Sequence, residues 1–320
     1  MVLGSEQWVK ALITGVSGFV GNHLCELLLS KGYEVIGLSR SEFKDSRIEF
    51  HKCDIRNQEE IEQIIKQVNP EEIYHLAALS YIPESLKAPI HTYNTIINGT
   101  LNLFEAIRKS NKNPKILFVG SGEVYGESTG GAFSERDAIQ PANIYAAAKA
   151  CAEIITQQYK NTFGLNVILT RPFNHTGPGQ SSLYACSSFA RQISEMEAGV
   201  REFIQVGNIN VERDFLDVRD VVNAYYMLML DGVSGEIYNV SSNYARSISD
   251  ILNCLFAHSF LESPMIISDN QKIRLNETAS RVGDNSKLIS QTDWRPEHNL
   301  DDTMGELLDF WRKYNKVASI

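Results

Sequence analysis

The stretch LITGVSGFVG at residues 12–21 carries a glycine at every third position. The three glycines follow an apolar run at residues 9–13 that predicts a buried parallel strand, and they precede residues 23–29, whose apolar spacing predicts a helix. In such a strand–turn–helix unit the first glycine permits a tight turn. The second lets the backbone approach a pyrophosphate, and the third lets the helix lie close to the strand. Phosphates then bind the N–H groups at the helix N-terminus. The stretch therefore predicts a dinucleotide site built from Gly15, Ser17, Gly18, Phe19, Val20 and Gly21.

The composition is that of an ordinary globular protein, with 320 residues, 43% of them hydrophobic and 22% charged. A net charge of −9 argues against a nucleic-acid or anionic-membrane surface. Residues 1–10 lack the pattern of a signal peptide, and no apolar run is long enough to span a bilayer. The seven histidines show no ligand spacing, so no metal site is expected. We expect buried thiols in a reducing cytoplasm from the five widely spaced cysteines, Cys25, Cys53, Cys151, Cys186 and Cys254.

Predicted strands and helices alternate through the first half of the chain. This alternation indicates a doubly wound parallel sheet, an α/β fold of the Rossmann type. We expect a cofactor-binding domain at residues 1–172 and a smaller mixed α/β domain, mainly for substrate, at residues 173–320, with some segments returning to the first domain. The predicted strands after the first are 33–38, 48–53, 72–76, 115–119 and 166–170, and the predicted helices are 57–68, 90–110 and 144–163.

The end of the second predicted strand bears on the choice of nicotinamide cofactor. An acidic residue there hydrogen-bonds the adenosine ribose of NAD, but this strand ends in Ser39 and Arg40. A serine and an arginine can bind a 2′-phosphate, which a carboxylate would repel. We therefore expect NADP(H) to be preferred, with NAD(H) as the alternative. Asp54, after the third strand, is either a partner of the adenine amino group or a helix N-cap.

Tyr145 and Lys149 lie four residues apart in the sequence YAAAK, on one face of a predicted helix. A nearby ammonium stabilises the phenolate form of a tyrosine, so this tyrosine can exchange a proton with a substrate oxygen while a cofactor transfers hydride. Ser121 follows the fifth strand, at the edge of the sheet where α/β proteins place ligand-facing groups. We expect its hydroxyl to hydrogen-bond the same oxygen.

These residues belong to a longer series of motifs, by which the chain resembles the extended short-chain dehydrogenase/reductases of the nucleotide-sugar branch. The resemblance implies a catalytic role for Ser121, Tyr145 and Lys149. It extends the cofactor site beyond the glycine turn to Asp54, Ile55, Leu76, Ala77, Ala78, Asn94 and Pro172. The motifs that carry it are TGVSGFVG at 14–21, HLAA at 75–78, NGTLNLFEA at 98–106, SGEVYG at 121–126, YAAAK at 145–149 and RDFLDVRD at 213–220.

Within this branch, RPFNHTGPGQ at residues 171–180 is most similar to GDP-4-keto-6-deoxy-mannose reductases and to the related GDP-mannose 4,6-dehydratases. The resemblance implies that Asn174 contacts the sugar diphosphate. It also implies that three residues, Arg213, Arg274 and Glu277, bind the diphosphate and nucleoside. Leu275 replaces the proline that usually follows the second of these arginines. The structural alternatives are Asn174 as a turn residue and Arg213 as an ion-pair partner of Asp217.

The residues after Ser121 bear on which reaction is catalysed. In the related 4,6-dehydratases, an acid in the next position helps the C6 hydroxyl leave, but here that residue is Gly122. Glu123 occupies the position of the base. The missing acid favours an NAD(P)H-dependent 4-ketoreductase acting on a GDP-4-keto-6-deoxy sugar. The alternatives are a 4,6-dehydratase, a 4-epimerase and a catalytically silent NADP(H)-binding regulator.

The two long predicted helices, 90–110 and 144–163, are apolar on more than one side. One side can cover the sheet, and the other needs a partner. The family's dimers bury these helices in a four-helix bundle. The resemblance therefore implies a homodimer, with a nucleotide sugar as the small-molecule partner.

Overall fold

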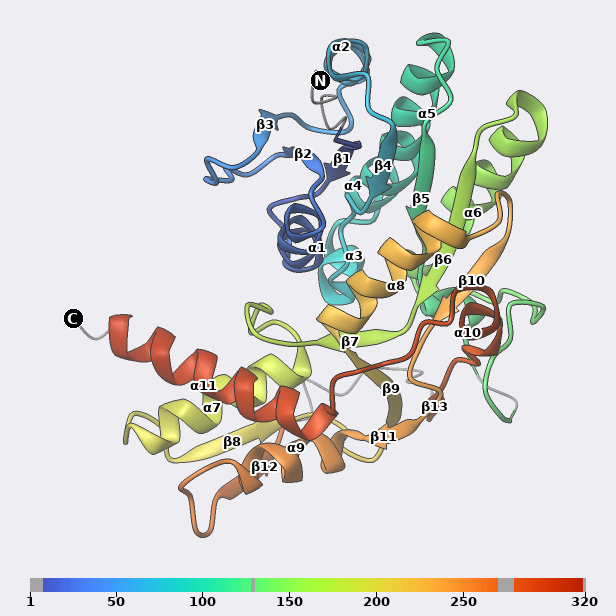
Figure 1. Cartoon of the computed structure of the whole chain (residues 1–320). Helices are drawn as coiled ribbons and strands as arrows, with labels where there is room; N and C mark the ends of the chain where they lie inside the picture. Colours follow the sequence, from blue (N-terminus) through green and yellow to red (C-terminus); the bar gives the residue numbers. More distant parts are fainter. Residues whose placement is uncertain (1–7, 128–129, 270–278, 319–320) are drawn as a thin grey trace. The chain divides into compact units, whose positions relative to one another are not determined.

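The structure, a computed structural model, describes residues 8–127, 130–269 and 279–318. The chain divides into two compact units, each made of three segments. Unit 1 consists of Met1–Val124, Pro141–Arg171 and Val222–Tyr238, and unit 2 of Tyr125–Gln140, Pro172–Val221 and Asn239–Ile320. The chain therefore leaves unit 1 at residue 125 and returns to it twice, as the colours in Figure 1 allow the reader to trace.

A seven-stranded sheet in the order β10-β6-β5-β4-β1-β2-β3 is the centre of unit 1. Strands β1 to β6 pair in parallel, and the strand order reverses beside β1. This arrangement confirms the doubly wound Rossmann-type fold. The strands are β1 Lys10–Thr14, β2 Glu34–Ser39, β3 Glu49–Lys52, β4 Glu72–His75, β5 Lys115–Val119, β6 Val167–Pro172 and β10 Ile237–Val240.

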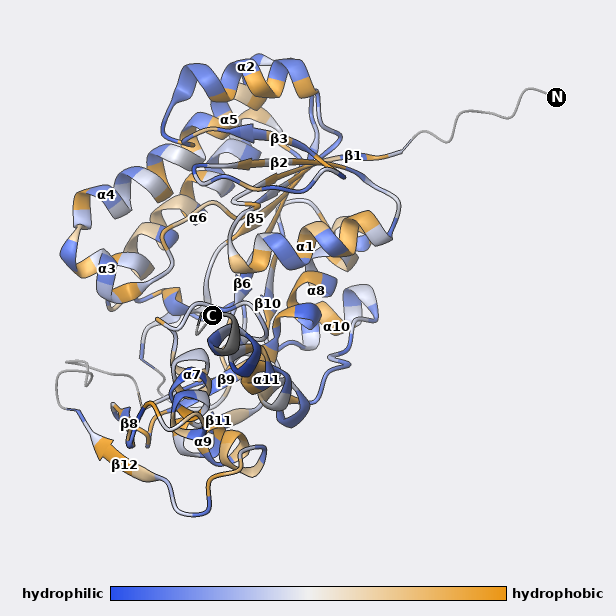
Figure 2. Cartoon of the chain, turned by 90° about the vertical axis from the view of Figure 1, so that its left-hand side faces the viewer, coloured by the Kyte–Doolittle hydropathy of each residue, from blue (hydrophilic) through white to orange (hydrophobic). Residues whose placement is uncertain are grey.

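Helices cover both faces of this sheet. Apolar side chains of α2, α5 and α6 form one core with the strands, and α1 and α8 lie on the opposite face (Figure 2). Two short helices and a π turn lead into α5. The bounds are α1 Phe19–Ser30, α2 Gln58–Val68, α3 Ile82–Lys87, α4 Pro89–Tyr93, η1 Asn94–Asn98, α5 Gly99–Lys109, α6 Ile144–Phe163 and α8 Val218–Asp231.

The helical stretch predicted at residues 90–110 is present at residues 89–109, but it contains a π segment that apolar spacing does not report. Between α4 and α5 the chain makes the π turn η1, in which the N–H of Gly99 bonds the carbonyl of Asn94. A π turn adds one residue to a helical turn, so the apolar positions before and after it do not share one helical stripe. The prediction for residues 144–163 is confirmed without change, because Asn143 caps α6 at one end and Gly164 ends it in a left-handed conformation.

Unit 2 contains a four-stranded sheet, a two-stranded parallel sheet of β8 and β12, and helices α7, α9 and α11 packed around an apolar core. The first sheet has the order β11-β9-β13, and β7 also pairs with β9. The strands and helices of unit 2 are β7 Asn174–Thr176, β8 Phe203–Val206, β9 Glu212–Asp217, β11 Ala245–Ser247, β12 Met265–Ser268, β13 Ser280–Arg281, α7 Ala185–Glu197, α9 Ile248–Ala257, α10 Ser286–Thr292 and α11 Leu300–Ala318.

The expectation of five buried thiols is wrong for Cys151, which is exposed because it lies on the outward side of α6. Cys25, Cys53 and Cys186 are buried and Cys254 is partly buried; all five are free thiols. In the described ranges, the helices fall short of the length and apolarity that crossing a bilayer requires. The same residues contain no cluster of histidine, cysteine and carboxylate side chains suited to a metal ion.

Candidate functional site

The glycine turn connects β1 to α1 in unit 1. Gly15 has φ +80°, and a Cβ there would lie 3.1 Å from the backbone of Ala77. A Cβ on Gly21 would lie 2.3 Å from the carbonyl oxygen of Gly15, so α1 packs against the turn more closely than any other residue permits. The N-cap of α1 is Gly18, which has no side chain to accept hydrogen bonds from the first turn, and that turn contains no acid. These features fit a bound pyrophosphate.

A buried chain of hydrogen bonds fastens this turn to the loop after β4. The N–H of Ala77 donates to Thr14 Oγ1 (3.1 Å), and Thr14 Oγ1 lies 2.8 Å from His75 Nδ1. On the other side, His75 Nε2 lies 3.0 Å from Thr100 Oγ1, which itself donates to the carbonyl of Ile96 (2.7 Å). Thr100 therefore accepts from Nε2–H, and Thr14 donates to Nδ1. Burial, with a smaller contribution from the charge of Lys149, lowers the pKa of His75 to about 3, so the ring is neutral.

Ser121, Tyr145 and Lys149 are brought together within unit 1. Ser121 follows β5, and its buried hydroxyl oxygen accepts the N–H of Glu123 (3.1 Å). Tyr145 and Lys149 are buried on α6, one turn apart. Lys149 Nζ donates to the carbonyl of Val119, the last residue of β5, at 2.6 Å. Burial lowers the pKa of Lys149 to about 8, so the ammonium form still dominates at neutral pH. The tyrosine–lysine pair is therefore anchored to the strand end that carries the serine.

Glu123 and Gly122 lie in a short 3-10 turn after Ser121. Asn143, the N-cap of α6, accepts the N–H of Ala146 with its side-chain oxygen (2.9 Å) and donates its amide to Glu123 Oε2 (3.2 Å). The Glu123 carboxylate is therefore a hydrogen-bond partner of the cap of the helix that carries Tyr145. Sequence reasoning missed this role of Asn143, although an asparagine directly before an apolar helix is a recognisable N-cap signal.

The residues expected around the adenosine lie at the ends of β2 and β3. The Ser39 hydroxyl donates to the carbonyl of Ser41 (2.6 Å), and Arg40 is exposed. Asp54 does not cap α2, which starts after Asn57; instead it binds Arg56 through both oxygens, at 2.6 and 3.0 Å. The hydrogen bond from Arg56 is the main reason that the pKa of Asp54 falls to about 2, and the charge of Arg40 contributes.

The other residues expected to bind the cofactor lie after β3, after β4, in the π turn and at the end of β6. Leu76, Ala77 and Ala78 follow β4 and are partly exposed. Asn94 opens the π turn and accepts the side-chain amide of Asn98 at 3.0 Å. Ile55 is buried, and a Cβ on Gly99 would lie 2.6 Å from its side chain. Pro172 is the first residue of a segment of unit 2 and ends β6.

The expected substrate residues that the structure describes lie in unit 2. Asn174 is in β7 and not in a turn, and Arg213 is in β9. Asn174 is in register with Phe215, which is two residues from Arg213 along the same strand. Register partners, and residues two apart on a strand, share a face of the sheet, so Asn174 and Arg213 lie on one face. Arg274 and Glu277 lie outside the described residues.

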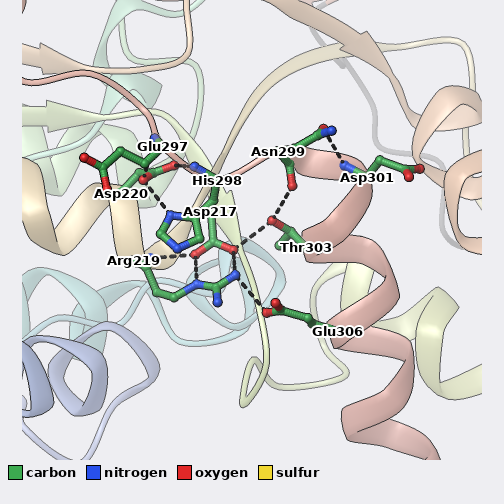
Figure 3. Close-up of polar contacts among 9 residues, drawn as sticks. All are labelled: Asp217, Arg219, Asp220, Glu297, His298, Asn299, Asp301, Thr303 and Glu306. Atoms are coloured by element: carbon green, nitrogen blue, oxygen red, sulfur yellow. Dashed lines mark hydrogen bonds and ion pairs between the residues drawn. The ribbon is translucent and has the colours of Figure 1, made fainter.

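The second half of the RDFLDVRD motif holds unit 2 together (Figure 3). Asp217 accepts hydrogen bonds from Arg219 (2.7 and 2.8 Å) and from the hydroxyl of Thr303 (2.8 Å). Asp220 accepts the backbone N–H of His298 (3.1 Å) and lies 2.8 Å from Nδ1 of the same ring. The ion pair considered between Arg213 and Asp217 is therefore wrong, because Asp217 is bound to Arg219 and to the start of α11.

Comparisons with known proteins agree with this description. The pattern of the family described as GDP-mannose 4,6 dehydratase matches residues 12–307. The GDP-6-deoxy-D-mannose reductase of Pseudomonas aeruginosa is 32% identical over 305 residues, 94% of this chain and 97% of the relative. The GDP-mannose 4,6 dehydratase 2 of Arabidopsis thaliana is 29% identical over 93% of this chain and 86% of its own length. The structure of RMD from Pseudomonas aeruginosa complexed with NADPH superposes with a TM-score of 0.86 at 31% identity, covering 96% of this chain and 99% of that one.

The resemblance drawn from the motifs is thereby confirmed. Both the match to the family pattern and the likeness to the reductase run through unit 1 and unit 2. Because the family pattern extends over nearly the whole sequence, from the glycine turn to α11, this chain belongs to the GDP-mannose 4,6 dehydratase family.

Proposed function

We propose that this protein reduces the C4 ketone of a GDP-4-keto-6-deoxy sugar to the alcohol, giving a GDP-6-deoxy sugar. The observation that carries the proposal is the turn after β5, where Gly122 leaves the position of the dehydratase acid without a side chain beside a complete Ser121, Tyr145 and Lys149 set. The 32% identity to a protein named GDP-6-deoxy-D-mannose reductase supports the same reaction.

In this reaction a bound nicotinamide cofactor supplies the hydride that adds to C4. Tyr145 donates its phenolic proton to the oxygen at C4, so the C=O bond becomes a C–OH bond. The Ser121 hydroxyl hydrogen-bonds the same oxygen and orients it. Lys149, held at 2.6 Å from the Val119 carbonyl, keeps a positive charge beside the phenolate that Tyr145 leaves behind. The buried position of all three groups strengthens these interactions by excluding water.

We propose NADP(H) as the preferred cofactor and NAD(H) as the alternative. Unit 1 would bind it over the glycine turn and the loop of Leu76, Ala77 and Ala78. The strand that ends at Ser39 has no acid at its tip, and Arg40 is exposed beside it, which suits a 2′-phosphate. The NADPH complex of the Pseudomonas aeruginosa protein supports this preference.

Unit 2 would bind the nucleotide sugar, with Asn174 and Arg213 on its diphosphate and with Arg274 and Glu277 completing the set. Asn174 and Arg213 share a face of the β9 sheet, as one common ligand requires. We also propose a homodimer through a four-helix bundle of α5 and α6, in a reducing compartment such as the cytoplasm. Ile154 and Cys151 are exposed on α6, and all five cysteines are free thiols.

A second candidate reaction is 4,6-dehydration, which the retained Glu123 and the dehydratase relatives favour. Against it, Glu123 accepts a hydrogen bond from the α6 cap and Gly122 cannot protonate a leaving hydroxyl. GDP-mannose supplied alone distinguishes the two reactions. A reductase yields little or no 4-keto-6-deoxy product, which is detected by its absorbance in alkali, whereas its rapid and stoichiometric formation would overturn the proposal.

The assay of reduction uses Tyr145→Phe with a GDP-4-keto-6-deoxy sugar and NADPH. The phenylalanine keeps the ring but removes the proton donor, so kcat should fall by about 10²–10⁴ while the Kd of NADPH is unchanged. Tyr159→Phe is the matched control, because Tyr159 lies on the same helix and donates to Glu105 on α5. A Tyr145→Phe enzyme as fast as the wild type would exclude the proposed role, and an enzyme that binds NADPH but never oxidises it would favour a regulator.

A further inference from the structure

A buried ion pair joins α6 to β6 in unit 1, beside the residues of the proposed reaction. Glu153 on α6 is 2% exposed and Arg171 on β6 is 4% exposed. Arg171 Nη2 donates to Glu153 Oε1 at 2.6 Å, and Arg171 Nε donates to Glu153 Oε2 at 3.0 Å. The guanidinium thus binds both carboxylate oxygens, the geometry that its planar fork provides. Neither the proposed cofactor site nor the proposed proton transfer uses these two residues.

The pair lies on the side of α6 that carries the tyrosine and the lysine. Tyr145, Lys149 and Glu153 follow one another at intervals of four residues, and side chains at this spacing are neighbours on a helix. Lys149 donates to the carbonyl of Val119 at the end of β5, and Glu153 binds Arg171 on β6. Helix α6 runs beside these two strands, which pair with each other (Figure 1). One side of the helix is therefore fastened to two neighbouring strands of the sheet.

The same ion pair borders Gly120, the residue before Ser121. The N–H of Gly120 donates to the carbonyl of Thr170 at 2.8 Å. A Cβ on Gly120 would lie 2.6 Å from that carbonyl oxygen and 3.6 Å from Glu153 Oε2. The Gly120 backbone therefore packs directly on β6, with the Glu153 carboxylate next to it. The ion pair thus lies at the strand ends that carry Ser121 and hold Lys149, and not in a remote part of unit 1.

Stability alone is a weak reason for burying these two charges. The desolvation cost of a buried ion pair often exceeds its attraction, and well-packed apolar residues can replace such a pair without loss. The position of Glu153 suggests a more specific reason, because its carboxylate is one helical turn from the ammonium of Lys149, and opposite charges at this spacing attract. Without Arg171, this carboxylate would be buried and unpaired, and it would draw the ammonium away from the Val119 carbonyl.

We propose that Arg171 is a positioning residue that holds the Glu153 carboxylate so that Lys149 stays bound to the end of β5, an inference that rests on the proposed function. Lys149 then directs its charge at the phenolate that Tyr145 leaves when it protonates the substrate oxygen. Glu153 and Arg171 act through Lys149, and the reacting atoms are contacted by Lys149 and its neighbours alone.

The first test measures reduction of a GDP-4-keto-6-deoxy sugar in a single turnover, per folded enzyme as counted with saturating NADPH. Arg171→Gln should lower the rate by about 10- to 100-fold, the scale of a small misplacement of a reacting group. Glu153→Gln keeps an acceptor oxygen for Arg171 but has no negative charge to attract Lys149, so its rate should stay close to that of the wild type. Adding Glu153→Gln to Arg171→Gln should restore most of the rate, because the released carboxylate is then absent.

Crystal structures of the wild type and of Arg171→Gln test the same point without a substrate. We expect Lys149 Nζ on the Val119 carbonyl in the wild type and on the Glu153 carboxylate in Arg171→Gln. If Arg171→Gln does not fold, Arg171→Lys takes its place in both tests. The lysine keeps the charge but loses the fork, so the rate should fall by less and should again recover when Glu153→Gln is added.

Arg312→Gln is the matched control, because Arg312 also binds both oxygens of a glutamate, Glu197, but lies in unit 2. It should lower the melting temperature and leave the rate unchanged. A double variant as slow as Arg171→Gln would overturn the proposal, and so would a Lys149 that stays on the Val119 carbonyl in Arg171→Gln. Lower melting temperatures with unchanged rates in all the variants would also overturn it, because they indicate a structural role alone. If the wild type does not reduce the sugar but Lys149 moves as expected, the positioning role is upheld and the proposed function is wrong.

Discussion

At the scale of single residues, the candidate site of unit 1 depends on buried polar groups that have partners. His75 is hydrogen-bonded on both ring nitrogens, and Lys149 donates to the end of β5. Burial disfavours the charged form of each, and the pKa of both groups is lowered. Lys149 keeps its proton near neutrality and can act on a phenolate. His75 stays neutral and acts as a fixed link between the glycine turn and α5.

The neutral His75 makes stability depend on pH with a definite sign. Its pKa is about 3 in the folded chain and near 6.5 when exposed, so the unfolded chain takes up a proton first as the pH falls. The contribution of the neutral His75 to the free energy of unfolding is fully present above about pH 6.5 and decreases towards pH 3. At pH 5 about 2 kcal/mol of this contribution is lost. In urea unfolding at pH 7.5 and pH 5, His75→Gln should lose about 2 kcal/mol less between the two pH values than the wild type or His51→Gln. Equal losses in all three proteins would show that His75 does not titrate in this way.

Arg40 provides the residue-scale test of cofactor choice. If its guanidinium binds a 2′-phosphate, Arg40→Ala should weaken NADPH binding by about 1–3 kcal/mol and leave NADH binding almost unchanged, because NADH lacks that phosphate. Fluorescence titration with each cofactor measures both constants, and Arg108→Ala on α5 serves as a surface control. If Arg40→Ala weakened the binding of NADPH and of NADH equally, the proposed preference for NADP(H) would have no support from Arg40.

The roles of some site residues could be predicted from the sequence, and the roles of others could not. The glycines, Tyr145 and Lys149 could be predicted because their meaning lies in short spacings along one element. His75 lies in the HLAA motif, but its hydrogen bond to Thr100 joins residues that are 25 positions apart and depends on how α5 packs on β4. The register that places Arg213 opposite Arg246 and Arg281 on neighbouring strands of unit 2 depends on long-range strand pairing, which no local pattern encodes.

At the scale of elements, the strands and α6 follow the predictions closely, and the helix predicted at 90–110 differs from its prediction by one π segment. Apolar periodicity identifies a helical stretch, but it does not report a single π turn such as Asn94–Asn98. The side of α6 that faces away from the sheet bears on the proposed dimer. Ile154 on α6 is 57% exposed and lies one turn from the exposed Cys151. An apolar outward side of this kind suits the proposed helix bundle between two copies.

We expect the wild type to run as a dimer, at twice the chain mass of 35.9 kDa, in light scattering at micromolar concentration. Ile154→Lys places a charge in the proposed bundle and should shift the protein to the monomer. Val200→Lys, at an exposed apolar residue of unit 2, should leave the dimer intact. A wild type found only at 35.9 kDa, or an Ile154→Lys protein that remains dimeric, would contradict the proposed interface.

At the scale of the whole molecule, the chain builds two units with different chemistry. Unit 1 carries the glycine turn and the serine, tyrosine and lysine set, and unit 2 carries Asn174 and Arg213 on one face of the β9 sheet. Sequence motifs predicted a cofactor part followed by a substrate part. They also predicted that some later segments return to the first part, but they did not identify residues 125–140 and 222–238 as the segments that change unit, because compactness depends on long-range packing.

The central claim is that hydride reaches C4 of a GDP-4-keto-6-deoxy sugar from an external cofactor, with net oxidation of that cofactor. The most direct measurement uses NADPH with deuterium in the transferred position on the nicotinamide, and follows the product by proton NMR. The account predicts one deuterium at C4 of the sugar, seen as loss of the H4 signal, for each NADPH oxidised. A product that carries protium at C4 while NADPH is not consumed would contradict the account and indicate a dehydratase or an epimerase, which regenerates its own cofactor.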